Sequence, residues 1–175
     1  MKKLAILIVF CLCIAACEKD DICDGTTPTT SQLVIKFYNA SNVPKKVTNL
    51  KIIADGMTLG VILDQTATGA AKFLSNDTII YIPLKTDLNT TKYKFILNST
   101  TALNKTDEIQ FNYSRKNEFV SRACGFKTVF DLNGTALQPF IINNSNASSG
   151  NWIQSIQLLQ PIIKNEKTIH IKIIF

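Results

Sequence analysis

The amino-acid sequence predicts an all-β protein whose body is a single-domain antiparallel β-sandwich of about 8–10 strands, with a small β-barrel as the alternative. Apolar and polar residues alternate along several short segments, which is the period of a half-buried strand. Turn-forming residues separate these segments at intervals of about 8–12 residues, which is typical of sandwiches and barrels. Beyond residue 16 we find no stretch of about 10 residues with helical periodicity.

The first half of the body is expected to contain several short strands. Leu33, Ile35 and Phe37 share one face of the first strand. The dipeptide Asp55-Gly56 predicts a hairpin turn into the next segment, and Pro83 indicates an edge strand or a strand end. The expected strands are residues 33–38, 47–54, 58–63, 72–74 and 77–84.

The second half shows the cleanest alternation, at residues 109–114, and we expect its aromatic side to face inward. The polar run Arg115-Lys116-Asn117 predicts a turn into the following strand. Residues 143–151, rich in Asn, Ser and Gly, form the longest expected loop. The other expected strands are residues 92–97, 118–122, 128–132, 152–159 and 168–175.

The N-terminus resembles a bacterial lipoprotein signal. Lys2 and Lys3 precede an apolar stretch at residues 4–14 that is too short to span a bilayer. Residues 14–17, Ile-Ala-Ala-Cys, resemble the lipobox, in which Cys17 receives lipid and becomes the new N-terminus. The alternative is a buried apolar segment with a chance cysteine. The expected organisation is a signal peptide (1–16), a lipidated acidic tether (17–24) and the β-sandwich domain (25–175).

The residues after Cys17 indicate a destination. Lys19, Asp20 and Asp21 resemble the export tag that directs some lipoproteins to the outer face of the outer membrane. We therefore expect a lipid-anchored outer-membrane protein exposed at the cell surface. The alternative to surface exposure is a location that faces the periplasm. The alternative to an export tag is that these charged residues are simply a solvated tether.

Cysteine usage indicates one disulfide. Cys11 and Cys13 would leave with the signal and Cys17 would carry lipid, so Cys23 and Cys124 remain. Two thiols in an oxidising envelope compartment should pair, although two free buried thiols are the alternative. The bond would close a loop of about 100 residues, for which chain entropy gives roughly 4–5 kcal/mol of stabilisation.

The search for catalytic chemistry is mostly negative. His170 is the only histidine, and its alternation with apolar neighbours predicts that it faces outward. Asp107 and Glu108 are adjacent in the sequence, and neighbours in a strand point to opposite faces, so they cannot act as a facing catalytic pair. Asp77-Thr78-Ile79 resembles a short bacterial O-glycosylation signal, with a plain strand start as the alternative. We expect no catalytic, cofactor-binding or metal site.

The body from Gly25 onward carries 16 basic and 9 acidic side chains. This excess would suit anionic polysaccharide or lipid headgroups, but solvated lysines on polar strand faces are the favoured explanation. No basic and aromatic interleave of the nucleic-acid-binding kind is present, so we expect no nucleic-acid partner.

Seven short motifs along the chain are informative when taken together. They are CEKDDIC at 17–23, FYNA at 37–40, VTNL at 47–50, FNY at 111–113, FVSRACGF at 119–126, NE at 165–166 and HIKI at 170–173. This combination resembles a family of short, uncharacterised bacterial lipoproteins, known only as a domain of unknown function. The resemblance implies no activity or binding residues. Its cysteine contexts support a shared disulfide between Cys23 and Cys124.

Two functions follow from these observations. The first is a non-enzymatic surface accessory protein that presents loops to an envelope protein or a glycan. Trp152, beside the longest loop, is the candidate ligand contact, with a core position as its alternative. The second is an envelope hydrolase that acts on polysaccharide through Asp64, Asp107 or Glu118. An enzyme is the less favoured of the two.

Overall fold

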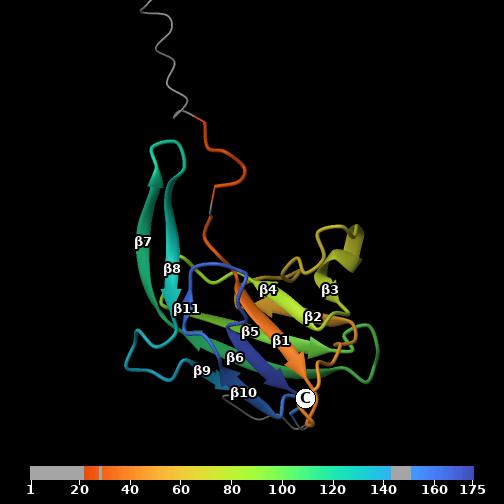
Figure 1. The fold of residues 1–175 in the computed structure, drawn as a ribbon. Coiled ribbons are helices and arrows are strands. Elements are labelled where there is room, and N and C mark those ends of the chain that lie inside the picture. Colours follow the sequence, from red (N-terminus) through yellow and green to blue (C-terminus); the bar gives the residue numbers. More distant parts are fainter. Residues whose placement is uncertain (1–21, 28, 143–150) are drawn as a thin grey trace, which may run out of the picture.

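The computed structural model describes residues 22–27, 29–142 and 151–175. These residues form a β-rich fold with three sheets (Figure 1). The four-stranded sheet has the order β10 (Ser155–Leu158), β12 (Ile171–Ile174), β1 (Leu33–Tyr38) and β4 (Ile79–Ile82). The five-stranded sheet has the order β3 (Leu74–Ser75), β2 (Leu50–Ala54), β5 (Thr90–Leu97), β6 (Lys105–Asn112) and β9 (Phe140–Ile142). The third sheet has the order β11 (Ile162–Ile163), β8 (Gly125–Asp131) and β7 (Ser114–Ser121).

The core lies between the inner faces of the sheets. Leu33, Ile35 and Phe37 of β1 are fully buried, and so are Phe95 of β5 and Phe111 of β6. Burial of such a side chain contributes roughly 1.5–3 kcal/mol. The predicted all-β sandwich is therefore confirmed, and no closed barrel forms among the residues that the structure describes.

The pairing of β1 and β12 departs from a purely antiparallel arrangement. These two strands run parallel, with Ile35 opposite Ile171 and Phe37 opposite Ile173. All other strand pairs in the described part of the chain are antiparallel. The last strand thus lies beside the first, and both place alternate apolar residues in the core.

Several predicted elements differ from the observed ones. The chain does turn at Gly56, whose φ is +87°, but residues 58–63 form no strand; a 3₁₀ helix, Gly69–Phe73, follows them and leads into β3. The predicted turn Arg115-Lys116-Asn117 is wrong, because these residues lie inside β7. The short strands β9 and β11 were not expected, and they help bring the described total to twelve.

Strands β7 and β8 form a hairpin, called the arm here, that projects from the sandwich in Figure 1. At its base Phe130 is fully buried and packs edge-on against Tyr113, with ring centroids 5.2 Å apart. No residue of β7 is buried, and the run Arg115 to Asn117, which begins one residue after the start of the strand, is exposed on both faces. Polar residues such as Lys116 can therefore occupy either face, which explains why the alternation expected of a half-buried strand is absent.

Candidate functional site

The tip of the arm is bonded to the beginning of the described chain. Cys124 lies in the turn between β7 and β8, where its backbone N–H donates to Ser121 Oγ at 3.0 Å. A disulfide joins it to Cys23, 101 residues earlier in the sequence, with the Cα atoms 4.9 Å apart. This pairing agrees with the one expected from the cysteine count.

The N-terminal segment also contacts the arm below its tip. The backbone N–H of Thr128 in β8 donates to Thr30 Oγ1 at 2.9 Å. The segment thus meets the arm twice, at the disulfide and seven residues further along the chain. Figure 1 shows this segment rising beside the arm toward its tip. The arm and the start of the body are therefore held together.

Large apolar side chains are exposed at this tip. Phe119 of β7 and Phe126 of β8 are opposite each other, with ring centroids 5.4 Å apart, yet they are 62% and 68% exposed. Ile22, next to Cys23, is 83% exposed. We call Ile22, Phe119 and Phe126 the apolar tip. Sequence analysis singled out the Phe positions only as part of a family motif, because an exposed strand has no inward face to reveal.

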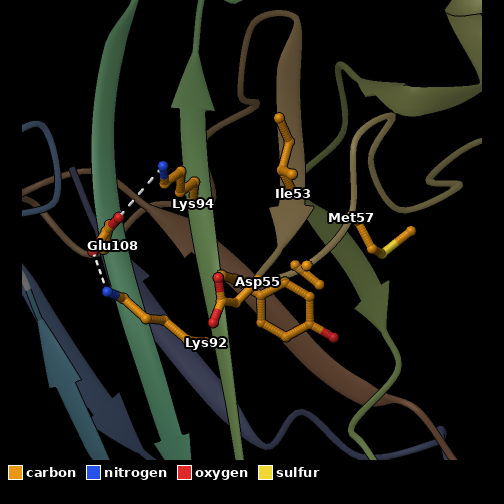
Figure 2. A pocket seen from close by; sticks show the side chains of 9 residues that line it. Ile53, Asp55, Met57, Lys92, Lys94 and Glu108 are labelled. Atoms are coloured by element: carbon orange, nitrogen blue, oxygen red, sulfur yellow. Dashed lines mark ion pairs between the residues drawn. The ribbon is translucent and has the colours of Figure 1, made fainter.

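A second feature is a small cavity of about 230 Å³ on the outer side of β2, β5 and β6. Figure 2 shows Glu108 of β6 near both Lys92 and Lys94 of β5. The Glu108 carboxylate is 2.6 Å from Lys92 Nζ and 3.8 Å from Lys94 Nζ. The hydrogen bond to Glu108 raises the pKa of Lys92. Ligand pockets usually span about 300–1,000 Å³, so this cavity could take only a small polar group.

His170 is buried, so the prediction that it faces outward is wrong. His170 directly precedes β12, and its side chain is fully buried next to Val34 of β1, which is buried too. Val34 N–H donates to His170 Nδ1 at 3.0 Å, and His170 N–H donates to the Val34 carbonyl oxygen at 3.1 Å. Burial lowers the pKa of His170, and the nearby Glu166 carboxylate offsets part of this effect.

The three carboxylates considered for hydrolysis have separate structural roles. Asp64 lies in the loop after β2, and hydrogen bonds from Thr66 lower its pKa. Asp107 of β6 is 1% exposed and accepts the backbone N–H of Ile153 at 2.8 Å. Glu118 of β7 lies 3.8 Å from Lys127 of β8 on the arm. The three carboxylates thus make three separate local contacts among the described residues.

Trp152 is a core residue, which was the alternative to a ligand contact. Its side chain is buried beside Phe37 and Phe175, and its Nε1–H donates to the Phe95 carbonyl oxygen at 3.1 Å. A ligand at the surface could reach only a small part of the indole ring. Thr78 directly precedes β4 and accepts the Phe37 N–H through its carbonyl oxygen.

Cys17, Lys19, Asp20 and Asp21, the residues expected to carry the lipid and the export tag, lie outside the described residues. In the part of the chain that the structure does describe, no helix is long and apolar enough to cross a membrane. The same residues contain no group of three or more His, Cys, Asp or Glu side chains arranged to hold a metal ion.

Comparison with known proteins gives one match. Residues 49–175, well over half of the chain, match a model described as "Family of unknown function (DUF6452)". The chain belongs to this family. No curated protein and no solved structure matches it. Membership supports the resemblance to a domain of unknown function, and it brings no activity with it.

The family region includes Cys124 and the whole arm, but it begins after β1 and after Cys23. Strand β1 nevertheless lies between β12 and β4 in the four-stranded sheet, and the disulfide crosses the boundary of the match. The described body therefore depends on residues that precede the family region.

Proposed function

We propose that this protein is a lipid-anchored, non-enzymatic accessory or binding protein of a bacterial cell envelope. In this proposal Cys17 carries the lipid, and Lys19, Asp20 and Asp21 direct the protein to the outer membrane with its body at the cell surface. The observation that carries the proposal is the Cys23–Cys124 disulfide. Structural disulfides persist mainly in oxidising compartments outside the cytoplasm, which supports export.

The position of the disulfide also supports a role for the anchor. Cys23 lies six positions after Cys17, and an extended chain of that length spans about 20 Å. Lipid at Cys17 would hold the tip of the arm within that distance of the membrane. The loops of the sandwich would then be available to an envelope protein or a glycan. The basic excess of the body favours an anionic partner.

The first experiment tests the anchor. The full chain is expressed in a Gram-negative host, and the mature protein is analysed by intact mass and N-terminal peptide mass spectrometry. We expect cleavage before Cys17, with acyl chains on that residue, and loss of both in the Cys17→Ala variant. An unmodified, uncleaved N-terminus in the wild-type protein would overturn the proposal.

The second experiment tests partner binding. Intact cells are chemically cross-linked, and the tagged protein is recovered and analysed by mass spectrometry. The control replaces Lys19, Asp20 and Asp21 with Ala, which should mislocalise the protein without altering the body. A stoichiometric envelope protein or glycan recovered with wild type and lost in the control would support an accessory or binding role. Recovery of the protein by itself from both would contradict it.

A further inference from the structure

The apolar tip gathers residues that are far apart in the sequence. Phe119 and Phe126 lie opposite each other across β7 and β8. Ile22 reaches the same place because its neighbour Cys23 is bonded to Cys124, two residues before Phe126. The tip is thus assembled by the arm and the disulfide together.

Packing within the protein does not account for this exposure. A cross-strand aromatic pair stabilises a hairpin, but more than half of each ring of Phe119 and Phe126 remains accessible. The pair at the base of the arm, Tyr113 and Phe130, is fully buried instead. Exposed clusters of large apolar side chains mark surfaces that contact a partner or a membrane.

The proposed lipid anchor favours the bilayer itself as the partner of the apolar tip. Lipid at Cys17 would keep the tip within about 20 Å of the bilayer, because Cys23 is only six positions further along the chain. Such tethering makes a weak second contact effectively intramolecular. Phe side chains at a membrane surface insert at the boundary between the lipid headgroups and the acyl chains. The exposed Arg122, in the turn of the arm, is suited to lipid phosphates.

We propose that the apolar tip enters the interfacial layer of the bilayer that carries the anchor, with Phe119 and Phe126 as its main contacts. The arm then acts as a rigid spacer that fixes the distance and orientation of the sandwich above the membrane. This inference rests on the proposed function, because it requires the lipid at Cys17. A second copy of the chain and an envelope protein are the competing occupants of the tip.

The test uses the full mature protein reconstituted into vesicles of phosphatidylethanolamine and phosphatidylglycerol, with lipidation first verified by intact mass. Phe126→Trp places a fluorescent reporter in the tip and keeps the aromatic pair. Trp152, buried in the core, supplies a constant background. The matched control is Leu103→Trp. Leu103 is 81% exposed and lies just before β6, at the end of that strand far from the arm.

We expect the reporter emission of Phe126→Trp to shift to shorter wavelength in vesicles and to lose intensity when the lipids carry bromine on their acyl chains. Leu103→Trp should show neither change. If the lipid at Cys17 is verified and the emission of Phe126→Trp does not change in vesicles, this inference is overturned and the proposed function still stands. A blue shift without bromine quenching would identify a second copy of the chain at the tip, since the vesicles contain no other protein, and would overturn the inference too. Protein without lipid in the mass measurement would refute the proposed function itself.

Discussion

Val34 and His170 are joined by two hydrogen bonds, because each backbone N–H donates to the other residue. The Val34 N–H donates to the imidazole Nδ1 at 3.0 Å, and the His170 N–H donates to the Val34 carbonyl oxygen at 3.1 Å. The imidazole therefore needs an unprotonated Nδ1. Its Nε2 atom, also buried, has no hydrogen-bond partner among the described residues. Both observations favour the neutral ring.

This arrangement predicts a loss of stability in mild acid. Burial lowers the pKa of His170 below its ordinary value of 6.5 in the folded state. Below pH 6.5 the unfolded chain therefore binds a proton that the folded chain excludes, so the free energy of unfolding falls as pH decreases. Above pH 6.5 both states are neutral and the full stability is present. Denaturant unfolding between pH 7.5 and pH 5 measures the decrease.

The control for this prediction is His170→Gln, which offers an amide oxygen to the Val34 N–H and does not titrate. Its unfolding free energy should be nearly constant over the same pH range, whatever its absolute value. Equal slopes for the wild type and this variant would show that other groups cause the dependence.

The disulfide predicts a large stability difference between oxidised and reduced protein. The bond closes a loop of 101 residues, and the chain-entropy model gives roughly 4–5 kcal/mol for a loop of about that length. Cys23→Ser with Cys124→Ser should lower the free energy of unfolding by up to that amount. Thermal and denaturant unfolding with and without reductant measure it. Reductant should not change the free energy of unfolding of the double variant. If that variant is less stable than the oxidised wild type by well under about 1 kcal/mol, the entropic argument is contradicted.

Two neighbouring carboxylates on β6, Asp107 and Glu108, should differ in how much stability is lost when each is replaced by alanine. Asp107 is buried and accepts the Ile153 N–H, whereas Glu108 faces the outer cavity with Lys92 and Lys94. Asp107→Ala leaves a buried donor unsatisfied and should cost about 1–3 kcal/mol. Glu108→Ala removes exposed ion pairs and should cost less than about 1 kcal/mol. Comparable losses in chemical denaturation of the two variants would refute the assigned roles.

The residues discussed above also show which structural features can be predicted from the sequence. Leu33, Ile35 and Phe37 were placed correctly because one face of β1 is buried and the period of two is therefore visible. The same period separates Asp107 from Glu108. His170 is buried although the alternation predicts that it faces outward, because its contact with Val34 joins residues 136 positions apart and leaves no local pattern. The polar run Arg115-Lys116-Asn117 predicts a turn although it lies inside β7, because a strand segment exposed on both faces carries no hydrophobic period.

The core position of Trp152 gives the last prediction. Its Nε1–H donates to the Phe95 carbonyl oxygen, and its ring packs edge-on against Phe175 with centroids 5.3 Å apart. Trp152→Phe keeps an aromatic ring but loses the donor, so it should cost about 1–3 kcal/mol of unfolding free energy. Trp152→Ala leaves a cavity as well and should cost about 3–5 kcal/mol. If Trp152→Phe folds normally and yet abolishes partner recovery from cells, the indole contributes to binding and its assignment to the core alone is wrong.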